Sequence, residues 1–149
     1  MAKTKKWYRA SLRLMGDGLS VNGIESKLRL KPSYVGVKGE RVDNNPRRGK
    51  YETNVWGWRS PCDSTVPFEE QIAGLLERIE PVRSELLEIL SLPHTEGELF
   101  LGFGSANGQG GAYLPPDLLR RVAACGLALS LDLYPHDMDQ IEAEELSMI

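Results

Sequence analysis

The sequence has few of the residues that metal sites and disulfide frameworks require. Its 149 residues include two cysteines and two histidines. Cys62 and Cys125 are far apart in the chain and form no Cys-x-x-Cys pair, which excludes a disulfide scaffold and a typical zinc site. We therefore expect two reduced thiols, with Cys125 in a helix core, and neither a metal nor a cofactor.

Long apolar runs are also missing. No stretch approaches the roughly 20 apolar residues that a membrane-spanning helix needs, and the opening MAKTKKWYRASLRL has no apolar signal segment. The composition, 41% hydrophobic and 26% charged, is typical of a globular protein. We expect a cytoplasmic protein with no membrane contact, built as one domain over residues 1–134 with an acidic, frayed or disordered tail over 135–149.

The glycine-rich stretch GFGSANGQGG, from Gly102 to Gly111, lacks the features of a phosphate loop. A Walker A loop needs a lysine that is absent here, and a dinucleotide fingerprint needs a third glycine where Asn107 stands. Asn-Gly pairs favour type I′ turns, so we expect a hairpin that returns through residues 112–114. A ligand-binding or partner-binding role of the loop stays open, and its candidate residues are Asn107, Gly108, Gln109 and Gly110.

Hydrophobic periodicity predicts four strands and three helical segments. Alternation over residues 7–15, 51–60, 99–103 and 127–133 is typical of half-buried strands, with Arg9 and Arg13 opposite the apolar face of the first. A weak helix near residues 20–28, capped by Ser20, precedes a long exposed connection over 31–50. A long helix opens at Pro67 and is kinked or split at Pro81, and a shorter helix runs from Pro116 to a C-terminal cap at Gly126.

This order predicts an α+β fold. Because all four strands alternate, each should have two different faces, which favours an antiparallel or mixed sheet of four or five strands with helices mainly on one side. The first three and last three elements resemble a weak internal repeat of strand, glycine-rich loop, helix and strand.

Charge is distributed unevenly along the chain, whose formal net charge is −3. Residues 1–50 hold 13 Lys and Arg against 4 Asp and Glu, whereas residues 51–149 hold 5 against 17. This polarity indicates either a charged partner or two halves that neutralise each other in the fold.

Three groups of residues could form a site. Asp132 and Tyr134 lie opposite the leucine face of the last strand, and would adjoin Arg9 and Arg13 if that strand neighbours the first. Trp56 and Trp58, near Arg59, are typical of stacking platforms and protein hot spots, although packing under the long helix is the favoured explanation for at least one of them. Basic residues of the long connection could contact phosphates: Lys38, Arg41, Arg47, Arg48 and Lys50.

The ordered segments YRASLRLMG, VWGWRS, PFEEQI, GSANGQGGAYL and LSLDLY resemble the bacterial family known as domain of unknown function 4279. The resemblance covers residues 7–134. It implies a small, single-domain bacterial cytosolic protein and implies no reaction or catalytic residue.

Three functions are compatible with these features. The first is a non-catalytic binding protein that recognises another protein, of the immunity or antitoxin type, because no nucleophile and base pair, metal cluster or phosphate loop is evident. The second is a nucleic-acid binder that uses the basic connection and the tryptophans. The third is an enzyme or small-molecule binder at the glycine-rich loop. The sequence leaves the oligomeric state open.

Overall fold

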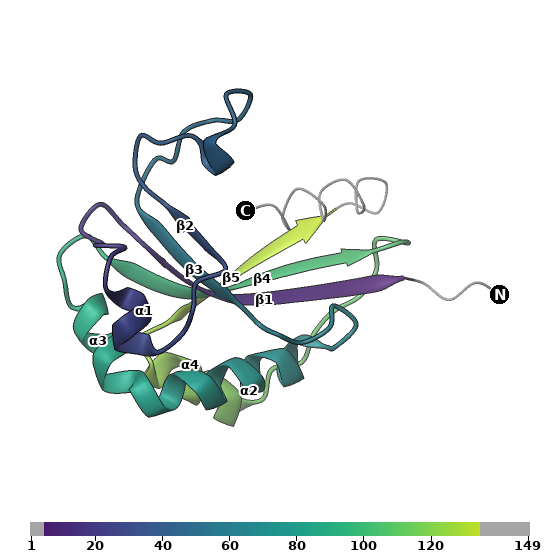
Figure 1. The fold of residues 1–149 in the computed structure, drawn as a ribbon. Coiled ribbons are helices and arrows are strands. Elements are labelled where there is room, and N and C mark those ends of the chain that lie inside the picture. Colours follow the sequence, from purple (N-terminus) through teal and green to yellow (C-terminus); the bar gives the residue numbers. More distant parts are fainter. Residues whose placement is uncertain (1–4, 135–149) are drawn as a thin grey trace.

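The computed structural model describes residues 5–134, which form a five-stranded mixed sheet (Figure 1). The strands lie in the order β2-β3-β1-β4-β5, and all neighbours are antiparallel except β4 and β5, which are parallel. Their bounds are Lys6–Met15 (β1), Tyr34–Gly36 (β2), Val55–Arg59 (β3), Glu96–Ser105 (β4) and Ala128–Tyr134 (β5). The expected α+β class and mixed sheet are confirmed.

The helices of residues 5–134 cover one face of the sheet, and none of these helices lies on the other face, called the open face below (Figure 1). They are Ile24–Leu28 (α1), Phe68–Ile79 (α2), Arg83–Leu90 (α3) and Pro116–Ala124 (α4), with 3₁₀ turns at Val42–Asn44 and Glu80–Val82. None of the described helices is long and apolar enough to cross a membrane.

The core lies between the sheet and the helices. Leu12 and Leu14 of β1 are fully buried, as are Ile72, Leu75 and Leu76 of α2. Apolar residues recur with a period of two on the strand and of 3.6 on the helix, so each element has one apolar face. These two faces pack together, as the sequence predicts.

Two helix boundaries follow the predicted signals. Pro81 cannot continue an α-helix because it lacks an N–H donor, and the chain forms the 3₁₀ turn Glu80–Val82 between α2 and α3. Gly126 takes the left-handed φ of 74° just past α4, a conformation that glycine adopts without steric cost. By contrast, α1 begins after Gly23 with no side-chain cap, so the expected capping by Ser20 is wrong.

Other predictions need correction. The connection over residues 31–50 contains β2, and no strand forms at residues 112–114, so the predicted return of a hairpin is wrong. From the turn at Ala106–Gly108 the chain instead leads to α4, which crosses back to the parallel strand β5. The internal repeat also fails, since β1 pairs antiparallel with β3 whereas β4 pairs parallel with β5.

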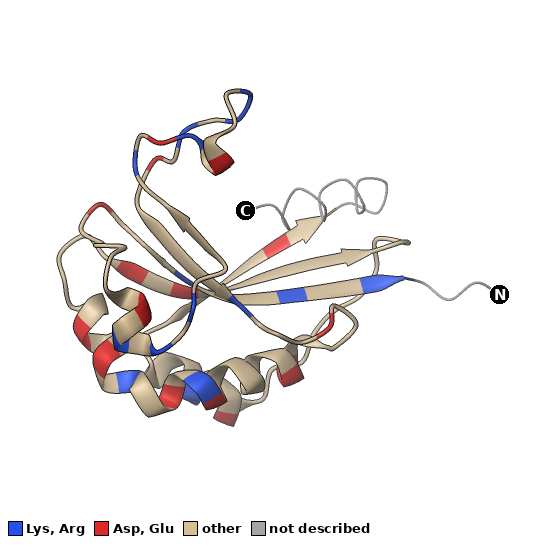
Figure 2. Ribbon diagram, in the orientation of Figure 1, with Lys and Arg blue, Asp and Glu red and all other residues tan. Residues whose placement is uncertain are grey.

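The charges of the two halves of the chain partly separate in space (Figure 2). The continuous helical segment from α2 to α3 carries six glutamates and two arginines, whereas β1 and the β2–β3 connection together carry eight lysines and arginines against three acids. The helical layer is therefore acidic, and arginines gather on the open side of the sheet.

Candidate functional site

The open face of β1 is lined by polar and aromatic side chains. Trp7, Arg9, Ser11 and Arg13 alternate with the core-facing residues of the strand, because successive strand residues point to opposite faces. Ser11 is buried at 6% exposure, while Arg9 and Arg13 are half-buried.

Glycines on the neighbouring strands make room for large side chains on this face. Gly104 pairs with Trp7, and a Cβ atom there would lie 2.2 Å from the indole nitrogen. Gly57 pairs with Tyr34, and a Cβ atom there would lie 2.1 Å from the Cζ atom of the phenol ring. Both aromatic rings therefore lie flat against the backbone of the next strand, which only glycine permits at these two positions.

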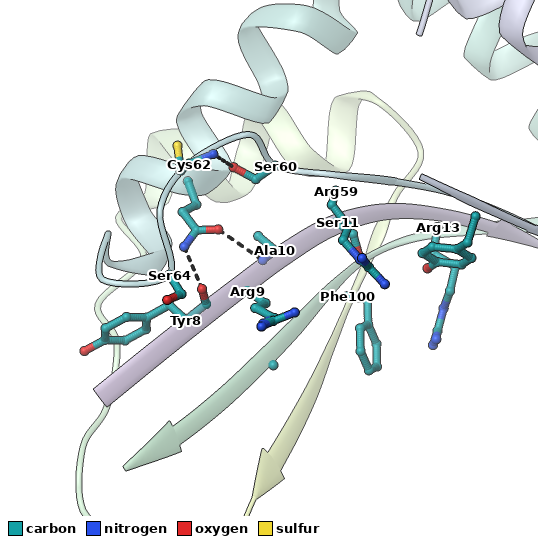
Figure 3. A pocket seen from close by; sticks show the side chains of 13 residues that line it. Tyr8, Arg9, Ala10, Ser11, Arg13, Arg59, Ser60, Cys62, Ser64 and Phe100 are labelled. Carbon is teal, nitrogen blue, oxygen red and sulfur yellow. Dashed lines mark hydrogen bonds between the residues drawn. The ribbon is translucent and has the colours of Figure 1, made fainter. Parts of the chain in front are cut away.

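A cleft of about 330 Å³ opens in the middle of this face, where β3 ends and the chain leaves the sheet (Figure 3). Its volume falls within the range of small-ligand sites. The lining has three arginines and no carboxylate or histidine among the described residues, and its charged and aromatic members are Arg9, Arg13, Arg59, Tyr8, Tyr34 and Phe100. The cleft is thus positively charged.

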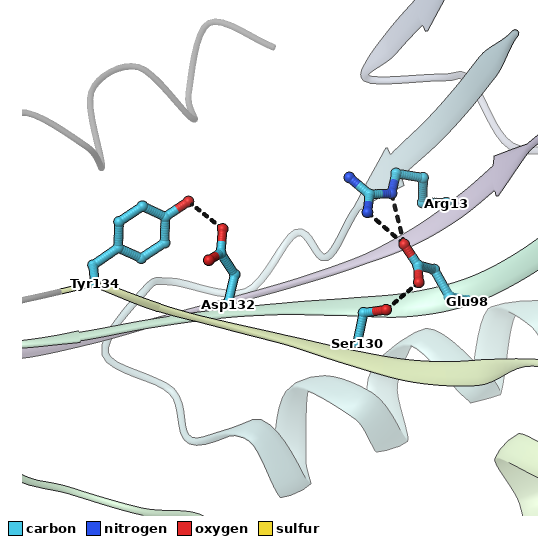
Figure 4. A network of polar contacts seen from close by, with 5 residues as sticks. All are labelled: Arg13, Glu98, Ser130, Asp132 and Tyr134. Atoms are coloured by element: carbon cyan, nitrogen blue, oxygen red, sulfur yellow. Dashed lines mark hydrogen bonds and ion pairs between the residues drawn. The ribbon is translucent and has the colours of Figure 1, made fainter. Parts of the chain in front are cut away.

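The three arginines are held in different ways. Arg13 donates from Nε and Nη2 to Oε1 of Glu98, at 2.8 and 2.5 Å (Figure 4). Its guanidinium lies 4.0 Å from the centre of the Phe100 ring. The guanidinium of Arg59 stacks on Tyr34 at 5.6 Å. Glu98 is itself only 7% exposed, and its second oxygen accepts a hydrogen bond from Ser130.

Arg9 differs because no acid of the described chain forms an ion pair with it. Its guanidinium lies 5.9 Å from the Trp7 ring centre. Burial lowers the pKa of Arg9 from its usual value, and the nearby charge of Arg59 lowers it further, partly offset by Tyr134. An arginine stays charged despite such a shift, so these two cations repel each other and an anion between them would relieve the repulsion.

Tyr34 of β2 also lines the cleft. Burial raises the pKa of its phenol, although a hydrogen bond with Ser11 and the charge of Arg13 oppose this effect. The ring is therefore neutral at physiological pH and presents both an apolar face and a polar hydroxyl to the cleft.

Gln71 of α2 closes the inner end of the cleft. Beyond Arg59, residues 60–64 replace β3 beside β1, with Ser60 N–H donating to the Ala10 carbonyl and Ser64 accepting from Tyr8. The remaining edge groups bind Gln71, whose Oε1 accepts from the Ala10 N–H at 3.1 Å and whose Nε2 donates to the Tyr8 carbonyl at 2.9 Å. The same amide also donates to the Val66 carbonyl at 2.8 Å, so Gln71 fixes the loop that forms this side of the cleft.

The structure separates the predicted site residues into different places. Arg9 and Arg13 line the cleft, but β4 lies between them and β5, so Asp132 is not on a strand that neighbours β1. Asp132 instead accepts a hydrogen bond from Tyr134 at 2.8 Å (Figure 4). The Tyr134 ring packs on Trp7 with ring centres 5.2 Å apart.

Trp56 and Trp58 lie in the core at 1% and 9% exposure, on the helical side of β3 and opposite Arg59. Neither ring offers an open stacking face, so the packing explanation holds for both. Arg78 of α2 lies 5.7 Å from the Trp58 ring centre on that side.

The basic connection extends away from the rest of the sheet (Figure 1), and none of residues 38–50 lines the cleft. Its cations have local partners: Lys38 pairs with Asp17 at 3.0 Å, Arg48 with Asp43 at 3.2 Å, and Arg41 donates to the Arg48 carbonyl at 2.8 Å. Arg47 and Lys50 are exposed.

The glycine-rich loop forms a turn at the far end of β4. Asn107 accepts from Ser105 at 2.7 Å and from the Gln109 N–H at 2.9 Å, while Gly108 and Gly110 take positive φ values. None of residues 107–110 lines the cleft. Among residues 5–134 no three His, Cys, Asp or Glu side chains converge as a metal site, Cys62 is exposed, and Cys125 is buried as expected.

Several site residues were missed at the sequence level, namely Ser11, Tyr34, Arg59, Glu98, Phe100 and Gln71. Gln71 had a visible signal, since it is a polar residue on the buried stripe of an amphipathic helix, between Phe68 and Leu75. Tyr34 had none, because β2 has only three residues and lies inside a segment rich in turn formers.

No curated protein and no solved structure matches the chain. A family model does match, over residues 5–136, and it is the one whose segments the sequence resembles. The chain belongs to that family, which is described as a domain of unknown function, DUF4279.

Proposed function

We propose that this protein is a non-catalytic binding protein that recognises an acidic segment of another protein in the cleft on the open face of its sheet. The observation that carries the proposal is the charge of the lining, which has three arginines and no carboxylate among the described residues. Guanidinium groups bind carboxylates through paired hydrogen bonds, and half-buried arginines do so more strongly than fully solvated ones.

The spacing of the arginines favours a chain with several carboxylates over a single small anion. Arg9 and Arg13 lie four residues apart on one strand, which corresponds to about 13 Å along the sheet. An extended peptide with acids at positions i and i+4 has the same spacing, so that each carboxylate would lie level with one arginine. Phe100 and Tyr34 offer apolar surface between these two positions.

The contacts of Glu98 within the chain support this mode of binding. It already occupies Arg13 through two hydrogen bonds to one oxygen, and Ser130 supports the second oxygen. Arg9 has no equivalent acid in the described chain, so a partner's carboxylate would gain the most binding free energy there.

The test is calorimetric titration of the full chain with an extended peptide that carries glutamates four residues apart. We expect binding that weakens as salt is added, since it depends on charge. The Arg9→Gln variant should bind at least about tenfold more weakly, which corresponds to about 1.4 kcal/mol. Arg83→Gln, an exposed arginine of α3 with the same charge change, should leave the affinity unaltered.

Two further ligands separate the alternatives. The same peptide with glutamines should not bind, and free glutarate should bind far more weakly than the peptide if several contacts along the chain contribute. Equal affinity for glutarate would indicate a small-molecule site. Binding of single-stranded nucleic acid with loss on neutralising residues 38–50 would replace the proposal by the nucleic-acid function.

A further inference from the structure

The outer strand β5 carries an exposed apolar stripe. Leu129, Leu131 and Leu133 lie on its helical side and are 38%, 60% and 63% exposed. Their neighbours across the ladder on β4, Leu99, Leu101 and Phe103, are buried at 0%, 3% and 8% exposure. The helices pack on β1 and on one another, whereas β5 makes its main contacts with β4 alone. The helical layer therefore leaves the leucine stripe of β5 exposed, although the facing residues of β4 are buried.

This strand also lacks the features that usually protect a sheet edge. The sheet of the described chain ends at β5, so its outer backbone groups have no neighbouring strand within residues 5–134. Natural edge strands carry lysine, proline, bulges or inward-facing charges that prevent pairing with another chain. The segment ALSLDLY has none of these on its leucine side, and its one charge, Asp132, points to the open face.

We infer that β5 is a dimerisation edge, on which a second copy of this chain pairs antiparallel about a two-fold axis at Leu131. In this register Leu131 lies opposite Leu131 of the second copy, and Leu129 opposite Leu133 of the second copy. All three leucines of each chain then meet leucines on one face of a continuous sheet, and cross-strand pairs of this kind stabilise sheets.

The opposite face supports the same register. Ser130 would lie opposite Asp132 of the second copy, so no two like charges meet. A shift by two residues in one direction places Asp132 opposite Asp132, which is unfavourable. The shift in the other direction leaves Leu133 opposite Leu127, a residue that lies outside the strand and is already buried at 7% exposure.

The size of this edge predicts a weak dimer. A pair of seven-residue strands buries less than the roughly 1,200–2,000 Å² of a standard stable interface. We therefore expect a dissociation constant in the micromolar range, so that the monomer and the dimer exchange as concentration changes.

Sedimentation velocity of the full chain over a range of concentrations tests the inference. We expect a monomer–dimer equilibrium that Leu131→Lys weakens at least about tenfold, since it places two like charges at the axis. Leu92→Lys is the matched control, because Leu92 is 45% exposed in the loop after α3, and it should dimerise as the parent does. A monomer at every concentration, or a dimer that Leu131→Lys leaves intact, overturns the inference.

Cross-linking gives a second readout that does not depend on a destabilising charge. In a Cys62→Ser background, Leu131→Cys places two thiols opposite each other at a Cα separation of about 4.5–5.5 Å, which a disulfide spans. We expect mild oxidation to yield a covalent dimer from Leu131→Cys and not from Leu92→Cys. If residues 135–149 of the same chain cover the edge instead, neither variant will cross-link and the protein will sediment as a monomer, which rejects the dimer.

Discussion

At the scale of single residues, Gln71 has the clearest structural role. A strand that loses its neighbour halfway along its length exposes backbone N–H and C=O groups, and burial of such groups without partners costs free energy. Beside β1 this happens at Tyr8 and Ala10, and the Gln71 amide satisfies both while it also holds the Val66 carbonyl.

We predict that Gln71→Leu, which keeps the size of the side chain and removes its hydrogen bonds, lowers the free energy of unfolding by about 2–3 kcal/mol. Gln109→Leu, an exposed residue of the glycine-rich loop, should change it by less than about 0.5 kcal/mol. Urea denaturation monitored by circular dichroism measures both values. Equal stabilities for the two variants would mean that the Gln71 amide has no part in closing the sheet.

Single residues were also where inference from the sequence reached least far. The alternation of Arg9, Ser11 and Arg13 was visible, and it places them on one face of a strand. Which residues would face them was not visible, because Tyr34, Arg59 and Phe100 come from three other strands whose register depends on tertiary packing. The need for glycine at Gly57 and Gly104 can be recognised only once Tyr34 and Trp7 are known to lie over them.

At the scale of elements, strong periodic patterns were reliable and short or irregular ones were not. The residues of β1 and α2 alternate or repeat over ten and twelve positions, and both elements lie where the sequence predicts them. The three residues of β2 are too few to show a period. The return strand at residues 112–114 was predicted wrongly because an Asn-Gly pair is typical of a hairpin, whereas the chain runs on to α4, whose crossover makes β5 parallel to β4.

The ion pair between Glu80 and Arg121 joins the turn after α2 to α4. Arg121 donates from Nη2 to Glu80 Oε1 at 2.7 Å and from Nε to Oε2 at 3.1 Å. These hydrogen bonds lower the pKa of Glu80 from its usual value near 4.5. Because the folded-state pKa is the lower one, the stabilisation is complete above the unfolded-state pKa and disappears as pH falls through the folded-state value.

We predict that Glu80→Gln lowers stability by about 0.5 kcal/mol at neutral pH, a small value because both side chains are more than a third exposed. The difference from the parent chain should vanish in strong acid, where Glu80 is protonated in both states. Urea midpoints measured from neutral to acidic pH test this. A difference that persists unchanged at the acidic end would show that the effect is steric and not electrostatic.

At the scale of the whole molecule, the fold separates its two faces by chemistry. The helical layer is rich in glutamate (Figure 2), while three arginines line the cleft on the open face. The uneven charge of the sequence predicts a charged partner, and in our proposal the cations that bind it are Arg9, Arg13 and Arg59 and not those of the basic connection. The apolar edge of β5 is a separate surface on the helical side of the sheet, so that pairing there leaves the cleft open.

The central claim is that this cleft binds carboxylates of an acidic polypeptide. An NMR titration of the ¹⁵N-labelled full chain with the glutamate peptide tests it most directly, because it reports where the ligand binds as well as whether it does. The account predicts saturable shifts of the backbone amides of Arg9, Ser11, Arg59 and Gly102, and their loss in Arg9→Gln. Shifts confined to residues 38–50 or to the helices, or no shifts at all, would contradict it.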